Sequence, residues 1–450
     1  MQLANYIELA DEIVGEIRAG RLRPGDRLPP QREFAHARGI AASTAQRVYA
    51  ELTKRGVVSG EVGRGTFVRL AARAARPALT EPTSLWVDLD LNFPTVPDQQ
   101  ALLSASLAEL MRRPDECGRA FAPASARGTR SLCSIASGFF STGRGWQLPT
   151  DCMYFAGNGK QAIAAALAAT VRPGETLGVE ALTYPFVKSI AQQLGIRLLP
   201  LPLDEEGIVP AALIEAHGDA GLNAVYLQPN LHNPLGISMS EIRRLEIAEI
   251  LSTERIVAIE DAIYAFLDAD LSSLRSLAPE QVILVDSLSK RLAPGFTLGL
   301  MVVPRDLRDG IERSLHTGAW VASSLAQTAC ARVMADGTAA KIVDAKRLDA
   351  AARQEVARRW LGRFGLIGNR KSYHCWLPLP HSWRADAFVA AAARRNIAVT
   401  PASAFAVAPG HVPNAVRVAL SAPPIDALSD ALEIVASILD GGGDALPFSE

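Results

Sequence analysis

The chain has 450 residues and a formal net charge of −1; 49% of its residues are hydrophobic and 21% are charged. This length exceeds what one hydrophobic core organises, so two or three domains of a globular protein are expected. No apolar run has the length of a membrane span, and the N-terminal stretch lacks the apolar segment of a secretory signal. These features argue against a membrane or exported protein and predict a cytoplasmic location.

Charge is distributed unevenly along the chain. Residues 1–76 hold 13 Lys and Arg against 8 Asp and Glu, whereas the remainder holds 33 against 39. A basic head on a mildly acidic body indicates that the head meets a polyanion, although chance is the alternative for so modest an excess. The five cysteines are scattered, odd in number and without metal-ligand spacing, so we expect reduced thiols and no metal site.

The first 69 residues predict a winged helix-turn-helix. Apolar residues recur at helical spacing over residues 5–19, a Pro-Gly break follows in RLRPGDRLP, and a short helix in PQREFAHARG ends at Gly39. After a four-residue turn, a second helix runs through STAQRVYAELTKRG, and VVSGEVGRGTFV predicts two strands joined by a glycine-rich turn. A small helical domain with a purely structural role is the alternative.

Such a domain places one helix in the major groove of DNA and its wing on phosphate or in the minor groove. The candidate contacts to a double-stranded operator are Arg32, Ser43, Thr44, Gln46, Arg47 and, in the wing, Arg64. The head resembles the GntR-type domain through PGDRLPPQREFA and GEVGRGTFV. It departs from that family at Ala41-Ala42, where Ser-Arg is usual, and the missing arginine removes a contact worth roughly 1–3 kcal/mol.

Residues 70–86 are predicted to be a linker, because Ala, Arg, Pro and Thr occur there with little apolar periodicity. Residues 87–450 then alternate short apolar runs with helical patterns. The strand-like runs are 176–181, 224–229, 256–261, 282–287 and 297–304. Buried runs separated by helices predict an α/β domain, with a mostly parallel central sheet and helices on both faces. Ligands of such sheets bind outside the carboxyl ends of the strands.

Polar residues at these strand ends suit a cofactor with an aldehyde, a ring and a phosphate. A desolvated lysine such as Lys290 forms a Schiff base, and a buried carboxylate such as Asp261 keeps a pyridine nitrogen protonated. The turn 157–159, ending in Gly159, precedes a helix and offers backbone N–H groups to a phosphate. Ser287 would add a hydroxyl to the same phosphate.

Four more residues fit the same kind of site. Tyr264 and Asn233 can hydrogen-bond a ring phenolate, Tyr184 can stack on an aromatic ring, and Arg417 can clamp a carboxylate through two hydrogen bonds. Each candidate can also be interpreted as an ordinary structural residue, such as a surface lysine, a helix N-cap aspartate, a core tyrosine or a turn asparagine. The order and spacing of all of them together favour the cofactor site.

The body resembles the fold-type I pyridoxal phosphate (PLP) enzymes of the aspartate aminotransferase superfamily, over roughly residues 85–440. The matching motifs are NGKQ, TYPF, HNPLG, EDAIY, SLSK followed by LAPG, PASAF and VRVALSA. The resemblance implies a smaller C-terminal α+β subdomain, Lys290 as the Schiff-base lysine and Asp261 as the partner of the pyridinium nitrogen. It also implies ring contacts from Asn233, Tyr264 and Tyr184, phosphate contacts from Gly159, Lys160 and Ser287, and a carboxylate contact from Arg417.

Two phosphate contacts usual in that superfamily are missing from the sequence. Thr297 follows LAPG where an arginine is usual, and Phe121 stands where a tyrosine often reaches the phosphate of the partner subunit. Because a hydrogen bond to a charged group contributes roughly 1.5–3 kcal/mol, we expect PLP to be held less tightly. Lys160 and Arg291 are the candidate substitutes.

A GntR-type head joined to an aminotransferase-like body is the layout of the MocR subfamily of bacterial regulators, which the chain resembles end to end. The resemblance implies a homodimer that binds an operator with two heads and senses a small amine or amino acid through the internal aldimine at Lys290. Two alternatives stay open. The chain is then either an active aminotransferase with a regulatory head or a degenerate aminotransferase fold that serves only as a dimeriser.

Overall fold

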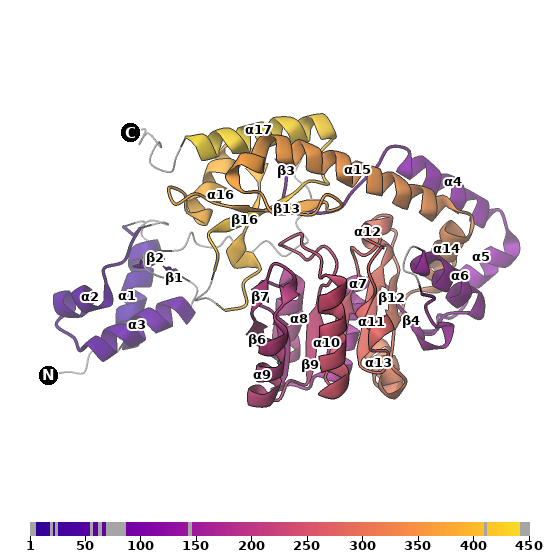
Figure 1. Cartoon of the computed structure of the whole chain (residues 1–450), viewed down its shortest axis with the longest axis horizontal. Helices are drawn as coiled ribbons and strands as arrows, with labels where there is room; N and C mark the ends of the chain where they lie inside the picture. Colours follow the sequence, from indigo (N-terminus) through magenta and orange to yellow (C-terminus); the bar gives the residue numbers. More distant parts are fainter. Residues whose placement is uncertain are drawn as a thin grey trace.

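The computed structural model describes residues 6–18, 21–22, 26–54, 57–61, 65–68, 87–142, 146–408 and 412–441. Within these ranges the N-terminal domain consists of α1 (Tyr6–Arg18), α2 (Gln31–Arg38), α3 (Ala42–Lys54), β1 (Val58–Glu61) and β2 (Gly65–Val68). The two strands pair antiparallel. This order of helices and strands is the predicted one, which confirms the winged helix-turn-helix (Figure 1).

The core of this domain is built from apolar side chains on the inner faces of its helices. Ile13 of α1 is buried, as its helical spacing predicts, and Val48 of α3 is buried as well. Helix α2 ends at Gly39, whose φ of 61° lies in the left-handed region that glycine adopts without strain. Part of the predicted break also joins the wing, because the Leu28 N–H donates to the carbonyl oxygen of Thr66 at 2.8 Å.

In the described part of the chain a seven-stranded sheet forms the centre of the large domain, in the order β4-β12-β11-β10-β9-β5-β6. Its strands are β4 (Met153–Ala156), β5 (Thr176–Glu180), β6 (Arg197–Leu201), β9 (Ala224–Leu227), β10 (Val257–Asp261), β11 (Val282–Ser287) and β12 (Gly299–Val302). Strand β12 runs antiparallel to both neighbours, and the other pairings are parallel. The prediction of a mostly parallel sheet is therefore confirmed.

Helices cover both faces of this sheet, as predicted (Figure 1). Ile259 packs in a cluster with α7 (Gly159–Thr170), α8 (Pro185–Leu194) and α13 (Arg308–Thr317). Ala258, the preceding residue, packs in another cluster with α9 (Pro210–Ala220), α10 (Glu241–Thr253) and α11 (Leu274–Leu277). Successive strand residues point to opposite faces, so the middle of each inner strand is apolar because both faces of the sheet are buried.

A third cluster covers the β4 end of the sheet. Strands β4 and β12 pack there against α6 (Arg130–Ser141) and α14 (Ser324–Ala335). Helices α4 (Gln99–Met111) and α5 (Pro114–Ala120) lie against α14. The turn η1 (Thr150–Cys152) leads into β4, and η2 (Arg305–Leu307) precedes α13.

A smaller C-terminal domain confirms the predicted α+β subdomain. Its antiparallel sheet contains β13 (His374–Pro378), β15 (Thr400–Pro401) and β16 (Ala415–Ala419), covered by α16 (Ala385–Arg394) and α17 (Ile425–Asp440). The long helix α15 (Thr338–Leu361) packs against α17 here and against α14 and α4 of the large domain (Figure 1). The other short elements are β7 (Leu203–Asp204), β8 (Gly207–Ile208), η3 (Gly362–Phe364) and η4 (Ala402–Ala404).

The first strand after the predicted linker belongs to this smaller domain. Strand β3 (Val87–Asp88) pairs in parallel with β14 (Ile397–Ala398). The linker predicted over 70–86 itself lies outside the described residues. The segment that follows β3 leads from the smaller domain toward the large one.

No helix among the described residues is long and apolar enough to cross a bilayer. The five cysteines carry no disulfide, and all but Cys117 are buried. Over the same described ranges, no three His, Cys, Asp or Glu side chains are grouped so that they could hold a metal ion.

Candidate functional site

Lys290 lies on α12 (Leu288–Arg291), the single helical turn that follows β11. Its Nζ donates a hydrogen bond to the carbonyl oxygen of Asn92 and lies 3.5 Å from the ring centroid of Phe93. Desolvation of the amino group and the positive charge of Arg417 hold the pKa of Lys290 well below its usual value. Because a neutral amine is the form that attacks an aldehyde, the site favours Schiff-base chemistry.

Asp261 ends β10, the parallel neighbour of β11, so its carboxylate and Lys290 follow strand ends at the same edge of the sheet. The buried carboxylate accepts hydrogen bonds from the Tyr226 hydroxyl at 2.5 Å, the Gln228 Nε2 at 3.3 Å and the Ile263 N–H at 3.1 Å. Burial raises the pKa of Asp261 to about 6 against the effect of these donors. A protonated ring nitrogen is the cationic partner that such a carboxylate needs.

The N-terminus of α7 and the end of β11 form a small polar cradle. Asn158 caps α7, since its Oδ1 accepts from the Gln161 N–H at 3.0 Å. A Cβ built on Gly159 would lie 3.1 Å from the Ser287 Cβ, so glycine keeps the space between them open. The Ser287 Oγ lies 3.0 Å from the Thr297 Oγ1. Two hydroxyls therefore lie beside helix N–H groups, a combination that suits a phosphate.

The two candidate substitutes for the missing phosphate arginine differ in position. The Nζ of Lys160 lies 3.6 Å from the ring centroid of Phe186, and burial lowers the pKa of this lysine. Arg291 instead forms a buried ion pair with Asp286, with 2.6 Å between Nη2 and Oδ2, and packs against three phenylalanine rings. The expectation that Arg291 substitutes at the phosphate is therefore wrong, because its guanidinium is held in the core.

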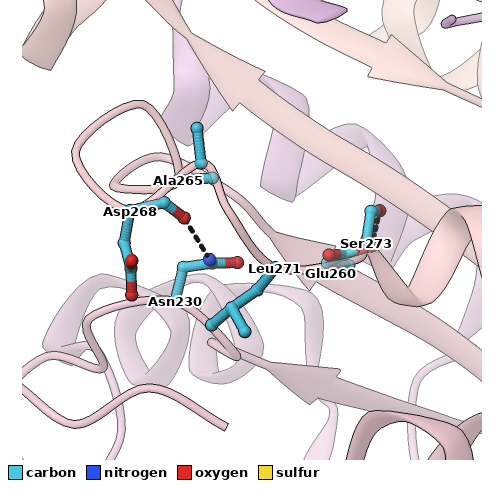
Figure 2. Close-up of a pocket in the computed structure, with 7 residues that line it drawn as sticks. Asn230, Glu260, Ala265, Asp268, Leu271 and Ser273 are labelled. Atoms are coloured by element: carbon cyan, nitrogen blue, oxygen red, sulfur yellow. Dashed lines mark hydrogen bonds between the residues drawn. The ribbon is translucent and has the colours of Figure 1, made fainter. Parts of the chain in front are cut away.

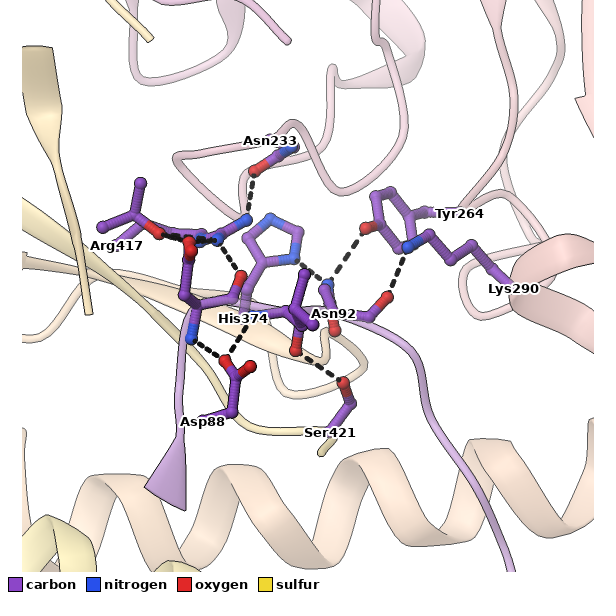
Figure 3. Close-up of polar contacts among 11 residues, drawn as sticks. Asp88, Asn92, Asn233, Tyr264, Lys290, His374, Arg417 and Ser421 are labelled. Atoms are coloured by element: carbon purple, nitrogen blue, oxygen red, sulfur yellow. Dashed lines mark hydrogen bonds and ion pairs between the residues drawn. The ribbon is translucent and has the colours of Figure 1, made fainter. Parts of the chain in front are cut away.

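Arg417 of β16 gathers polar groups from three separate segments (Figure 3). Its Nη1 donates to the Asn233 Oδ1 at 3.3 Å. Its Nη2 donates to the Thr400 Oγ1 at 2.7 Å, to the Asp90 Oδ1 at 3.0 Å and to the Asp90 carbonyl oxygen. The guanidinium side chain is only 8% exposed, so these acceptors replace its hydration.

Tyr264 is linked to His374 through the side chain of Asn92 (Figure 3). The Asn92 Nδ2 donates to the Tyr264 hydroxyl oxygen at 3.0 Å and lies 3.3 Å from the His374 Nδ1. The His374 Nε2 lies 3.0 Å from the His232 carbonyl oxygen, which can only accept, so Nε2 carries the ring proton. Burial lowers the pKa of His374 to about 3, which keeps the ring neutral and its Nδ1 an acceptor.

Tyr184 precedes α8 and faces the same region. Its ring stacks on Phe186 with centroids 5.8 Å apart and an interplanar angle of 24°. Desolvation raises its pKa, and the charges of Tyr264 and Asp261 act on it in the same direction. The structure thus brings together the nine body residues predicted from the sequence, Lys290, Asp261, Tyr264, Asn233, Tyr184, Gly159, Lys160, Ser287 and Arg417. Their roles toward a cofactor stay a prediction.

Several neighbours of this site were not predicted from the sequence. Asp90 and Asn92 follow the predicted linker, in a stretch without helical or strand periodicity. Lys346 of α15 donates to the carbonyl oxygens of Lys290 and Leu292, at 3.0 and 2.6 Å, and burial lowers its pKa to about 7. A lysine in the middle of a long helix gives no sequence signal of such a contact. The one sequence feature that could have pointed to this part of the site was the presence of charged residues just after the predicted linker.

A small cavity on the other side of β10 is separate from this site. Figure 2 shows Asn230, Glu260, Asp268 and Ser273 around it, with the Asn230 Nδ2 donating to the Asp268 carbonyl oxygen at 3.1 Å. Its volume of about 10 Å³ admits one water molecule. Since Glu260 and Asp261 are successive strand residues, they point to opposite faces, and only Asp261 faces the Lys290 side.

The candidate DNA contacts of the head lie largely on its outer surface. Helix α3 buries Ala45 and Val48 and exposes the opposite face. Arg32, Ser43, Gln46 and Arg47 are exposed and Thr44 is half-buried. The wing residue Arg64 lies outside the described residues. Contact of these side chains with DNA stays a prediction.

Family comparisons agree with the two folds. The model of the family "Aminotransferase class I and II" matches residues 86–435, so the chain belongs to that family. The model "Bacterial regulatory proteins, gntR family" matches residues 5–68. Fold and site thus define a class of protein, the helix-turn-helix transcription regulators that bind DNA through a GntR-type head and carry a PLP-type aminotransferase domain.

Relatives similar over most of their length share this two-part organisation. The HTH-type transcriptional regulator YdeF of Bacillus subtilis is 30% identical over 97% of this chain and 94% of its own. The vitamin B6 salvage pathway transcriptional repressor PtsJ of Salmonella typhimurium is 27% identical over 90% and 92%. "Probable rhizopine catabolism regulatory protein MocR" of Rhizobium meliloti is 24% identical over 78% and 75%. The chain belongs to this MocR subfamily.

Solved structures confirm the fold of the body. The crystal structure of an archaeal alanine:glyoxylate aminotransferase matches with a TM-score of 0.72 and 19% identity, over 88% of this chain and 94% of that one. At this identity the likeness concerns the fold. The aminotransferase class I and II fold and the donors gathered around Lys290 together indicate PLP as the cofactor.

The raised pKa of Asp261 predicts a pH-dependent stability of the cofactor-free protein. The folded pKa of about 6 exceeds the ordinary value of 3.8, so the folded state binds more protons between these values and stability falls as pH rises through them. A shift of this size corresponds to about 3 kcal/mol. Asp261→Asn should remove this slope from denaturant unfolding measured between pH 4 and 7. The exposed Asp426→Asn should retain it, and an equal slope in all three proteins would contradict the assignment.

Proposed function

We propose that this regulator senses a small amine or amino acid at Lys290 and that the ligand changes the placement of its DNA-binding heads. The observation that carries the proposal is the pairing of a low-pKa Lys290 amine with a buried Asp261 carboxylate at adjacent strand ends, in a chain whose head has a DNA-binding fold. Such chemistry has no use in DNA binding itself. It does recognise amines, so a sensor accounts for both domains.

The residues of the site fit PLP, which when bound supplies an aldehyde and an electron-withdrawing ring. Asp261 would hold the ring nitrogen and Tyr184 would stack on the ring. The Tyr264 hydroxyl oxygen already accepts from Asn92, so its own proton is left to donate to the ring phenolate oxygen. Asn233 would hold the same oxygen through its amide nitrogen, because its Oδ1 accepts from Arg417.

The rest of the site would fix the phosphate and the effector. Gly159, Lys160 and Ser287 would bind the phosphate, with Thr297 beside them as a neutral partner. Arg417 would take the carboxylate of an amino acid effector. The protein would act in the cytoplasm, where operator DNA lies, as a homodimer that presents two heads to two half-sites.

An active aminotransferase with a regulatory head is a second candidate. It is favoured because the buried carboxylate, the ring tyrosine, the lysine and the carboxylate arginine occur together in one site. Transfer of an amino group from an amino acid to a 2-oxo acid at ordinary enzyme rates, on the order of 1–10³ per second, would support it. Stoichiometric reaction without turnover would support the sensor.

Replacing Lys290 tests the cofactor assignment. The purified protein should absorb near the wavelength of a lysine–PLP adduct, and Lys290→Ala should lose this band, since the variant has no amine at that position. It should also bind PLP more weakly than the parent, because a neutral Thr297 stands where an arginine is usual. Absorbance spectra and PLP titration measure both effects.

The exposed Lys341→Ala is the matched control and should keep the band. A parent protein that shows no band and takes up no PLP would rule out a PLP sensor. The remaining reading would then be a degenerate fold that only dimerises.

Arg47 tests the DNA-binding face. Arg47→Ala should weaken binding to duplex DNA by about 5- to 150-fold, equivalent to roughly 1–3 kcal/mol, and lower the salt slope by about one. Fluorescence anisotropy at several salt concentrations measures both. Arg394→Ala removes the same charge from an exposed position in the smaller domain and should change neither DNA binding nor PLP uptake. Equal losses in both variants would point to a general charge effect.

The homodimer is supported by a large aromatic side chain on the surface. Phe121, at the end of α5, is 71% exposed in the single chain. Aromatic residues at the centre of an interface contribute on the order of 2 kcal/mol or more, so Phe121→Ser should weaken a dimer at least about 30-fold. Sedimentation velocity over a concentration series measures this. A monomeric parent protein, or a variant dimer of unchanged strength, would contradict this role.

A further inference from the structure

A short segment after β3 passes directly between the two charged centres of the site. We call residues 89–93 the strap. The strap is pinned to the smaller domain, since the Leu89 N–H donates to the Ala398 carbonyl oxygen at 2.9 Å and the Leu89 carbonyl oxygen accepts from Ala419 at 2.8 Å. Asp88 shapes its start, because its Oδ1 accepts from the N–H groups of residues 90 and 91, both at 2.8 Å. In the sequence, the strap is the first part of the site after the predicted linker.

One end of the strap occupies the carboxylate-binding arginine. The Asp90 Oδ1, the Asp90 carbonyl oxygen and the Thr400 hydroxyl all accept from the Arg417 Nη2. The Thr400 hydroxyl donates to the same Asp90 Oδ1. The Asp90 side chain is 48% exposed whereas that of Arg417 is 8% exposed. The carboxylate can therefore move into water at little cost, but the guanidinium needs another anion in its place.

The other end of the strap holds the reactive amine. Lys290 Nζ donates to the Asn92 carbonyl oxygen, while the Asn92 side chain donates to Tyr264. Covalent capture of Nζ by an aldehyde removes N–H donors from it, which weakens this contact. Lys290 is expected to meet a cofactor and Arg417 a carboxylate. Both are thus hydrogen-bonded to the strap, at positions within three residues of each other.

From this geometry we infer that Asp90 is an internal competitor for the effector carboxylate at Arg417. A ligand carboxylate takes the guanidinium edge that Asp90 holds, Asp90 moves into solvent, and the strap is released toward the linker. The inference rests on the proposed function and adds its ligand class: the effector carries a carboxylate. An amine without one reaches Lys290 but leaves Asp90 on Arg417, so it fails to release the strap.

Hydrogen exchange of the strap in the full-length protein tests this inference. Asp90→Ala and Asp90→Asn should each raise the exchange of a peptide covering residues 87–94 by about ten-fold, because the Arg417 contact no longer holds it. Asp90→Asn keeps the side-chain shape and so separates loss of charge from local unfolding. The exposed Asp219→Ala makes the same charge change as Asp90→Ala and should leave exchange unchanged.

Propionate is the probe for the carboxylate, because it has no amine and cannot react at Lys290. It should raise strap exchange in the parent protein, whereas 1-propanol and an equal concentration of chloride should not. By calorimetry it should bind Asp90→Asn about ten-fold more tightly than the parent, a gain that a purely structural role of Asp90 would not give.

Two results would overturn the inference: unchanged strap exchange in both Asp90 variants, or no response of the parent strap to propionate. Neither readout uses PLP absorbance or DNA binding. Failure of the proposed function, seen as a protein without PLP uptake or without DNA binding, is therefore distinguishable from failure of the strap.

Discussion

The free energy required to bury charge controls the arrangement of this site. Asp261 and Arg417 lie almost out of water, and Lys290 loses hydration at its amino group, so each needs a partner that replaces solvent. Asp261 responds with a raised pKa and Lys290 with a lowered one, while Arg417 collects acceptors from several segments. A cofactor that brings a ring N–H to Asp261 and an aldehyde to Lys290, together with an effector that brings a carboxylate to Arg417, would satisfy all three.

The parallel sheet makes this concentration of charge possible. The ends of β10 and β11 place Asp261 and the Lys290 turn side by side. The apolar clusters on both faces of the sheet stabilise the fold and so offset the free-energy cost of the polar site. The DNA-binding head has its own separate core. Head and site are joined in two ways: by the chain that enters the body at β3, and by the Arg384 guanidinium of the smaller domain, which lies 3.7 Å from the Phe67 ring centroid of the wing.

Much of this molecule could be predicted from the sequence, for physical reasons. Buried strands such as 282–287 begin with a continuous apolar run, and Gly39 ends a helix whose C-terminus requires a left-handed residue. Eight of the nine body residues lie at or after strand ends or at helix starts, where motif and topology coincide, whereas Arg417 lies in the middle of β16. Arg291 was misjudged because a sequence does not show that an arginine beside a reactive lysine turns into the core to meet Asp286.

Asp90, Asn92 and Lys346 could not be found in this way. Their contacts join residues 54 to 327 positions apart in the sequence. Sequence patterns report local periodicity and local turns, so they do not reveal contacts between residues this far apart.

The long helix α15 holds the helical turn of Lys290 in place through hydrogen bonds. With 24 residues at about 1.5 Å each, it is a rod of roughly 36 Å that packs on both domains. Lys346, one-third of the way along the helix, donates hydrogen bonds to two carbonyl oxygens of the Lys290 turn. A neutral amine retains two N–H donors, one for each of these carbonyls. Both hydrogen bonds can therefore form whether or not Lys346 is protonated. A tilt of α15 would then move the backbone of Lys290 throughout the neutral pH range.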